Sequence, residues 1–335
     1  MQGLQNLGAT CAVNSLIQII CRTDYLRDII LNSEVSPDTL TAELKEILHM
    51  MHHGNHHVSP GKFLTHLYRH FDGIFRRGEQ MDIGELWMFL FDRLASELAH
   101  HSTEVDDNIR TVDLDTYNNA MMASDPDLQK HCLVTMNRFN NNKTSAWLDT
   151  SQGIMLNIIK CNKCTNIVYN FEPFISIAVD IPEDDDLHTI AEMFRNYLKA
   201  QICDEHWKCD KCNQSTSYTK QLKIWKMPNV LIFIIKRFAN MHMKNTKPII
   251  INKSICVKKG SILNDMSKDY NYKCTAMGYH LGGLYGGHYF SICNLPDDKY
   301  VLYDDLNVNI ISDEKINGIF DCNKDAYMLV YTLVP

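Results

Sequence analysis

Two pairs of cysteines place the strongest constraint on how this chain of 335 residues can fold. The segment CNKC supplies Cys161 and Cys164, and CDKC supplies Cys209 and Cys212. Each pair has knuckle spacing, and four thiolates complete the tetrahedral coordination of a structural zinc ion. One ion binds all four if residues 165–208 form a hairpin and a helix that return to their starting point. Two unrelated thiol pairs are the alternative.

The cysteine content also bears on the compartment. Twelve cysteines are compatible with a secreted disulfide scaffold. The first residues, MQGLQNLG, show neither the charged region nor the apolar region of a signal peptide. We therefore expect a reducing compartment, cytoplasmic or nuclear, where close cysteine pairs more often hold metal. A zinc ion held by four protein ligands has no open position, so we expect it to stabilise the fold rather than to catalyse.

Composition narrows the class of protein. Apolar residues make up 45% of the chain and charged residues 22%, which is typical of globular proteins. No apolar segment reaches the roughly 18 residues that a membrane-spanning helix needs. The net charge of −7 disfavours nucleic acid as a partner and favours a basic one.

The N-terminal segment contains a candidate nucleophile. Residues 3–10 form a glycine-punctuated loop, and the apolar residues after Cys11 recur at helical spacing. Cys11 would therefore begin a helix, where the positive helix end and its free N–H groups favour a thiolate. A small buried thiol that opens a core helix is the alternative interpretation.

The chain from residue 11 to residue 100 predicts mostly helix, including segments 40–51, 63–71 and 82–98. Glycine and asparagine interrupt this pattern within HHGNHH, so we interpret this segment as a solvated loop rather than a metal site. The histidines concerned are His52, His53, His56 and His57.

Asp82 and Glu85 lie three residues apart on one face of the last of these helices. Spacing alone favours a solvated surface over a docking site for an arginine of a partner. Residues 102–146 are polar and predict a connector with one short helix at 128–139, whereas 174–181 and 229–238 predict strands.

A glycine-rich loop precedes His288, and strand residues follow it. The Walker pattern of lysine and serine or threonine is absent, so the loop does not predict phosphate binding. The partner strand of the next hairpin ends in Asp304 and Asp305. Because cross-strand neighbours have Cβ atoms about 5 Å apart, an acid there can orient the imidazole. Cys11, His288 and Asp304 thus supply a nucleophile, a base and an orienting acid.

At this point the motifs resemble a known family. GLQNLGATCAVNSLIQ resembles the Cys box of the ubiquitin-specific proteases, QMDIGELWMFL their glutamine/aspartate/glutamate box, and GGHYFS with YVLYDD their His box. The motifs span essentially the whole chain in one order. The resemblance implies a single α+β catalytic domain with a papain-like cysteine protease fold. A helical thumb would occupy residues 1–150, zinc-binding β fingers with part of the palm 151–230, and the β-sheet palm with the His box 231–335.

The resemblance also implies roles for individual residues. Cys11 matches the nucleophile, His288 the general base and Asp304 the orienting acid, with Asp305 as the alternative acid. Asn6 matches the residue that stabilises the oxyanion. Binding of the basic C-terminal tail of ubiquitin would fall to Gln80, Asp82, Glu85, Gly287 and Tyr289, which replaces the solvated-surface interpretation of the two acids.

The implied function is a deubiquitinating thiol protease whose partners are ubiquitin and ubiquitinated proteins, as a monomeric catalytic unit open to regulatory partners. A protease for another ubiquitin-like modifier and a catalytically silent ubiquitin-binding module are the alternatives. A transglutaminase also uses Cys, His and Asp, but lacks the zinc fingers and this order of boxes. Some residues depart from the family pattern, and we expect these departures to change packing without removing a reacting group. They are Ala9, Ala12, Ile83, Leu86 and Ser151.

Overall fold

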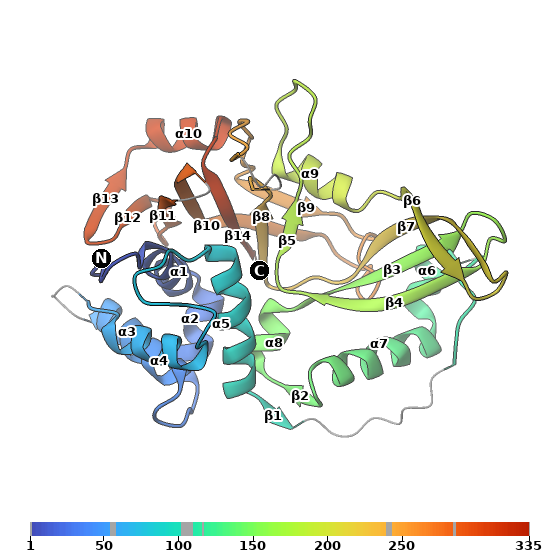
Figure 1. Ribbon diagram of the computed structural model, residues 1–335, viewed down its shortest axis with the longest axis horizontal. Coiled ribbons are helices and arrows are strands. Elements are labelled where there is room, and N and C mark those ends of the chain that lie inside the picture. Colours follow the sequence, from blue (N-terminus) through green and yellow to red (C-terminus); the bar gives the residue numbers. More distant parts are fainter. Residues whose placement is uncertain are drawn as a thin grey trace.

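The computed structural model describes residues 2–53, 58–101, 110–115, 117–238, 243–283 and 286–334. A group of helices lies against one face of a long sheet, and a second sheet extends to one side (Figure 1). This mixed architecture confirms the predicted α+β fold of thumb, palm and fingers. Among the described residues, no helix is both long and apolar enough to cross a membrane.

The thumb consists of helices that share one apolar core with the near face of the palm sheet. Leu16 and Leu90 belong to this core, and so do Val301 and Tyr303 of the sheet. Asp82 caps the N-terminus of the longest thumb helix, because its carboxylate accepts a hydrogen bond of 2.8 Å from the backbone N–H of Glu85. The helices are α1 (Cys11–Arg22), α2 (Asp24–Asn32), α3 (Leu40–His53), α4 (Gly61–His70), α5 (Ile83–Glu97) and α8 (Ala146–Ser151).

The palm is an antiparallel sheet with one parallel edge pair. Its order is β13-β12-β11-β10-β14-β8-β5, and β9 also pairs with β10. Helices α9 (Ile190–Tyr197) and α10 (Asp313–Asp321) contribute to a second core on the face opposite the thumb. The strands are β5 (Ile177–Val179), β8 (Val230–Ile235), β9 (Ser254–Val257), β10 (Tyr270–Gly283), β11 (Gly286–Asn294), β12 (Tyr300–Asp304), β13 (Asn307–Ile311) and β14 (Ala326–Leu333).

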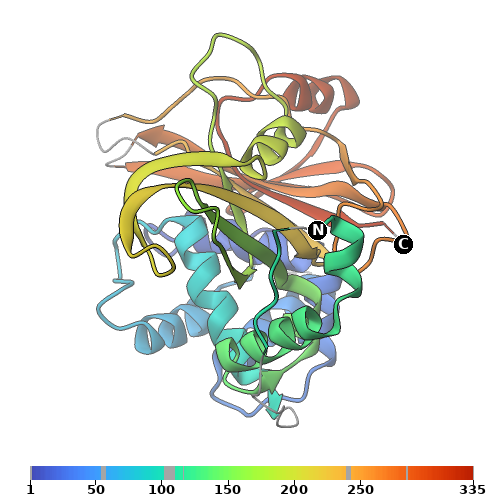
Figure 2. The same cartoon turned by 90° about the vertical axis from the view of Figure 1, so that its right-hand side faces the viewer.

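The fingers are a four-stranded antiparallel sheet in the order β4-β3-β7-β6. Its strands are β3 (Gly153–Cys161), β4 (Ile167–Phe174), β6 (Gln201–Cys209) and β7 (Gln214–Lys226). Helix α7 (Pro126–Phe139), which follows α6 (Asn119–Ser124), lies along this sheet (Figure 2). Its residues Leu128 and Cys132 belong to the same apolar core as the sheet. The helices before residue 150 are therefore divided between two cores, and residues 126–139 belong with the fingers rather than with the predicted thumb segment.

Local boundaries differ from the sequence prediction in two places. The predicted strand 174–181 is divided, because β4 ends at Phe174 and β5 begins at Ile177. The polar segment pairs with the thumb through two short strands, β1 (His100–His101) and β2 (Lys143–Thr144). Of the predicted histidine loop, His52 is exposed in α3, whereas His56 and His57 lie outside the described residues.

Candidate functional site

Cys11 is the first residue of α1 and only 4% of its surface is exposed. Burial raises the pKa of its thiol, and the negative charge of Asp305 raises this pKa further. Backbone hydrogen bonds from Tyr289 of β11 and from Ala12 at the helix start lower this pKa, but they are outweighed. The prediction that the thiol ionises more readily than a free cysteine is therefore wrong for this state of the protein, because desolvation is the larger effect.

His288 and Asp304 lie on the adjacent strands β11 and β12. The Nε2 atom of His288 is 2.5 Å from Oδ1 of Asp304. Because Asp304 contacts Nε2, the ring nitrogen that does not face this acid is Nδ1. Strand β11, which carries His288, packs against helix α1, which begins at Cys11. Among the described residues, no hydrogen bond joins the thiol of Cys11 to His288. Catalytic contacts often tighten only when substrate binds, so we expect the thiol–imidazole contact to form in the substrate complex.

The neighbouring acid has different partners. Asp305 occupies the turn after β12 with a left-handed φ of 51°. Its Oδ2 accepts a hydrogen bond of 2.8 Å from Nδ2 of Asn6, and its Oδ1 accepts one of 2.7 Å from Nδ2 of Asn14. In the described structure Asp304 thus contacts the imidazole, and Asp305 contacts two amides.

The loop before the nucleophile is shaped by Asn6 and by glycine. The Oδ1 atom of Asn6 accepts a hydrogen bond of 2.9 Å from the backbone N–H of Gly8, which has a φ of 98°. A Cβ atom at Gly3 would lie 2.5 Å from the backbone oxygen of Asp305. A side chain at Gly3 would therefore force the N-terminal segment away from the turn that carries Asp305.

Asn14 is a site residue that the sequence analysis missed. It is 2% exposed and lies one helical turn after Cys11. An amide on the buried face of a helix is a signal of a polar partner, since buried polar groups need hydrogen bonds. The partner, Asp305, is 291 positions away in the sequence, so nothing local identifies it.

The predicted tail-binding residues join the thumb to the palm. Gln80 exchanges two hydrogen bonds with the backbone of Gly287: its Nε2 donates to the carbonyl oxygen at 2.6 Å, and its Oε1 accepts from the N–H at 2.9 Å. The hydroxyl of Tyr289 donates to Oδ2 of Asp82 at 3.2 Å. Glu85 is exposed beside them on α5. The structure therefore brings four of these residues together as two contacting pairs, Gln80 with Gly287 and Asp82 with Tyr289, and leaves Glu85 exposed.

A buried histidine explains why residue 287 is glycine. A Cβ atom at this position would lie 2.2 Å from Nε2 of His280, which is 5% exposed. The imidazole of His280 packs against the ring of Tyr289 with ring centroids 4.6 Å apart. Burial lowers the pKa of His280, which favours its neutral form. The backbone at Gly287, at the start of β11, therefore lies directly against the His280 ring.

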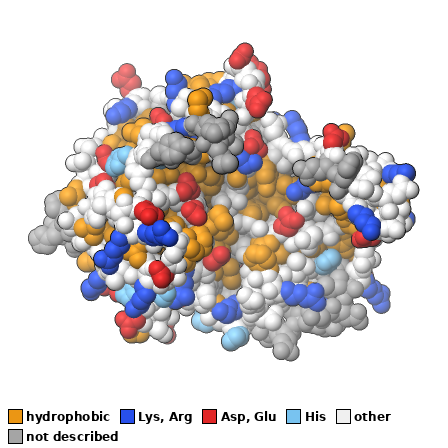
Figure 3. Space-filling model, viewed as in Figure 1, with side chains coloured by type: hydrophobic (Ala, Val, Ile, Leu, Met, Phe, Trp, Pro, Cys, Tyr) orange, Lys and Arg blue, Asp and Glu red, His pale blue; other side chains and the backbone are white. Residues whose placement is uncertain are grey.

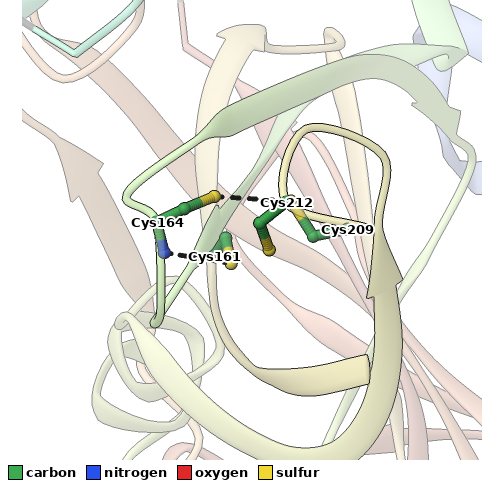
Figure 4. Close-up of side chains that lie close together, drawn as sticks. All are labelled: Cys161, Cys164, Cys209 and Cys212. Carbon is green, nitrogen blue, oxygen red and sulfur yellow. Dashed lines mark hydrogen bonds between the residues drawn. The ribbon is translucent and has the colours of Figure 1, made fainter. Parts of the chain in front are cut away.

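The four predicted zinc ligands converge at the end of the fingers (Figure 4). Their sulfur atoms all lie within 4.8 Å of one another, and those of Cys164 and Cys209 are 3.6 Å apart. Zinc–sulfur bonds of about 2.3 Å in a tetrahedron separate sulfur atoms by about 3.8 Å. The donor set therefore fits one tetrahedral zinc ion, with Cys161 and Cys212 as the remaining ligands.

The two knuckles have the same backbone shape. Cys161 ends β3 and Cys209 ends β6, and the residue after each second cysteine, Thr165 or Asn213, has a left-handed φ of 58° or 53°. The N–H of Thr165 donates to the carbonyl of Cys161 at 3.1 Å, and the N–H of Asn213 donates to that of Cys209 at 2.8 Å. Each turn therefore presents two thiols on one side, as a shared metal requires.

Comparisons with known proteins agree with this architecture. The family model described as "Ubiquitin carboxyl-terminal hydrolase" matches residues 2–331. Ubiquitin carboxyl-terminal hydrolase 4 of Saccharomyces cerevisiae is 26% identical over 98% of this chain and 39% of its own length. Ubiquitin carboxyl-terminal hydrolase Usp2 of Drosophila melanogaster is 25% identical over 98% of this chain and 34% of its own length. The chain thus spans between about a third and two fifths of these curated relatives.

A solved structure shares the fold. A chain of the SAGA Ubp8/Sgf11/Sus1/Sgf73 DUB module bound to ubiquitin aldehyde superposes with a TM-score of 0.72 and 21% identity. The match covers 100% of this chain and 70% of that chain. The arrangement of thumb, palm and fingers is therefore common to both.

Proposed function

Because the chain belongs to the ubiquitin carboxyl-terminal hydrolase family, we propose that it is a deubiquitinating thiol protease. As a ubiquitinyl hydrolase it cleaves the peptide or isopeptide bond after the C-terminal glycine of ubiquitin. The observation that carries this proposal is the His288–Asp304 contact of 2.5 Å on strands packed against the helix that Cys11 begins. A solvated histidine in a surface hairpin needs no such partner.

The reaction follows from the groups at the site. The sulfur of Cys11 attacks the carbonyl carbon of the terminal glycine, and Nδ1 of His288 receives the thiol proton. The imidazolium then protonates the departing amine, the carbon–nitrogen bond breaks, and a thioester remains. A water molecule that gives its proton to His288 hydrolyses the thioester and regenerates Cys11. Asp304 holds the imidazole through Nε2 in all of these steps.

Asn6 fits the role of oxyanion donor. One of its two amide hydrogens is directed to Asp305, which leaves the other for the substrate oxygen. The backbone N–H of Cys11 is the second donor in this proposal. Such donors contribute most when they are fixed before the reaction, since no reorganisation is then required.

Ubiquitin is recognised, in this proposal, by the face shown in Figure 3. Apolar side chains gather across the middle of this face, with acidic side chains among them. The basic tail of ubiquitin runs past Asp82 and Glu85 towards Cys11, under the loop that carries Gly287. One zinc ion, held by the four clustered cysteines, keeps the fingers in shape. We place the protein in the cytoplasm or nucleus, as a monomeric catalytic unit acting on ubiquitinated proteins.

The proposal is tested with a ubiquitin–fluorophore substrate. Cys11→Ala is expected to abolish release of the fluorophore and to leave ubiquitin affinity unchanged, because the thiol supplies the nucleophile and no binding surface. Cys256→Ala is the matched control, since Cys256 is an exposed cysteine outside the site. If Cys11→Ala still releases the fluorophore, the proposed mechanism is wrong.

Electrophilic probes separate the two alternatives from this proposal. Labelling of Cys11 by a ubiquitin probe supports a deubiquitinase, whereas faster labelling by a probe built on another ubiquitin-like modifier supports a protease for that modifier. Ubiquitin binding without labelling by either probe supports a silent binding module.

A further inference from the structure

Helix α1, which begins at Cys11, contains a buried side-chain amide, that of Asn14, which no step of the proposed reaction uses. Nδ2 of Asn14 lies 2.7 Å from Oδ1 of Asp305, 3.3 Å from the carbonyl of Gln5 and 3.4 Å from that of Leu4. Two amide hydrogens cannot serve three acceptors equally. The shortest of the three contacts is also the one to a charged acceptor, so Asp305 is the principal partner.

The oxygen atom of the Asn14 side chain shows why residue 14 must present a hydrogen-bond donor to Asp305. Oδ1 of Asn14 is buried and has no hydrogen-bond partner among the described residues. Rotating the amide by half a turn would place this oxygen against the carboxylate of Asp305, which is repulsive in a buried environment. Asp305 therefore holds Asn14 with its N–H groups pointing at the carboxylate.

Asp305 is also hydrogen-bonded to the loop that precedes Cys11. Its second oxygen accepts from Asn6 at 2.8 Å, and Asn6 in turn accepts from the N–H of Gly8. The backbone oxygen of Asp305 also accepts a hydrogen bond of 2.9 Å from the N–H of Leu4. A chain of hydrogen bonds thus runs from the interior of α1 through Asp305 to Asn6.

Asp305 is also within reach of the catalytic histidine. One ligand atom from each of His288, Asp304 and Asp305 lies within 4.8 Å of the others. An Asp305 carboxylate without its amide partners would be free to compete with Asp304 for the imidazole. The two amides keep the neighbouring acids in separate roles.

We propose that Asn14 is a positioning residue: by binding Asp305 it fixes the amide of Asn6 in the loop before Cys11 and keeps Asp305 away from His288. This inference rests on the proposed function, because it assigns Asn6 to the oxyanion. It adds a residue deep in α1, one turn beyond the nucleophile, to the groups that determine the rate.

Kinetics of an apolar variant provide the first test. Asn14→Leu keeps the approximate volume and removes the donor, so kcat on the ubiquitin–fluorophore substrate is expected to fall about ten- to a hundredfold, since small misplacements at a reacting centre have effects of this size. KM is expected to change little, because Asn14 is buried and offers no surface to ubiquitin.

Gln18→Leu is the matched control. Gln18 lies one turn further along α1, is also 2% exposed, and donates a hydrogen bond of 2.8 Å to the carbonyl of Gln2 without touching Asp305. Both variants are expected to lower the melting temperature. If Gln18→Leu lowers kcat as much as Asn14→Leu does, the effect is one of packing and the proposal is wrong.

A swap of donor and acceptor tests the contact itself. Asn14→Asp places two carboxylates against each other and is expected to lower kcat at least as much as Asn14→Leu. Adding Asp305→Asn reverses the pair: the new amide at position 305 donates to the new carboxylate at position 14, and its oxygen still accepts from Asn6. Recovery of kcat in the double variant supports the proposal, and failure to recover in a folded double variant overturns it.

Amide hydrogen exchange reports the position of the loop without turnover. Faster exchange of residues 5–10 in Asn14→Leu than in Gln18→Leu supports the proposal, and equal exchange overturns it. This measurement decides the matter even if the wild-type protein does not cleave ubiquitin substrates, a result that would reject the proposed function alone.

Discussion

At the scale of single residues, the buried thiol of Cys11 makes reactivity depend on pH. Burial and the charge of Asp305 both raise the pKa of this thiol, so the thiolate fraction at neutral pH is small and rises with pH. We expect the rate of Cys11 alkylation by iodoacetamide, followed by mass spectrometry, to increase up to a pH above the ordinary cysteine range. Asp305→Asn removes the negative charge, lowers the pKa and should move this profile to lower pH.

The control for this measurement is Asp298→Asn, which removes an exposed acid that pairs with Lys273 at the surface and is absent from the influences on Cys11. Its alkylation profile should match that of the wild type. A profile that moves to higher pH in Asp305→Asn would contradict the assigned influence of Asp305.

The sequence offers local signals for the proposed reacting residues but not for the residues that hold them. Cys11, His288 and Asp304 each stand beside a local signal: a helix start, a glycine-rich loop and the end of a strand. Asn14 has no such signal, because its importance depends on a carboxylate that the fold brings from the far end of the chain. The pKa of Cys11 was predicted in the wrong direction for a related reason, since burial is a property of the folded state.

At the scale of elements, the two knuckles hold the ends of β3 and β6 at one metal site. Zinc removal with a chelator, or Cys161→Ser, is expected to lower the melting temperature and reduce the zinc content from close to one ion per chain to near zero, because three thiolates bind zinc less tightly than four. Zinc content is measured by atomic absorption and unfolding by calorimetry. Cys203→Ser, a cysteine of β6 outside the cluster, should change neither quantity appreciably.

The rate of Cys11 alkylation shows whether loss of zinc affects only the fingers or the whole protein. The fingers and the thumb have separate cores, so alkylation of Cys11 should be nearly unchanged in Cys161→Ser at temperatures below unfolding. A folded protein that contains no zinc and melts normally would contradict the zinc site.

Elements with strong periodicity were predicted well, and those defined by tertiary contacts were not. The helix predicted at 82–98 corresponds to α5, and the one at 128–139 corresponds to α7. The sequence does not predict which element α7 packs against, because an apolar helix face looks the same whether it packs on the fingers sheet or on the thumb helices. The strand predicted at 174–181 is divided because its first part pairs in the fingers and its second part pairs in the palm.

At the scale of the whole molecule, the thumb and the palm meet next to the nucleophile through a few polar contacts. Gln80 binds the backbone of Gly287, and Asp82 accepts from Tyr289. Asp82 also caps the N-terminus of α5, so its loss should reduce stability by about 1 kcal/mol as well as affect ligand binding. A substitution of Asp82 would therefore change both the stability of the protein and its binding of the basic tail, and the two effects could not be separated. Glu85 has an exposed carboxylate and allows them to be separated.

Glu85→Arg is expected to weaken ubiquitin binding roughly tenfold with little change in melting temperature, because a favourable pair with the basic tail becomes a repulsive one, each worth up to about 1 kcal/mol at an exposed site. Fluorescence titration of ubiquitin at low and high salt measures the effect, which should shrink as salt screens the charges. Asp92→Arg makes the same change in charge on the exposed side of α5, further from its start, and should leave affinity unaltered. Equal affinity of the two variants would return Glu85 to the solvated-surface interpretation and would leave Asp82 as the acid at this end of α5 that the basic tail could contact.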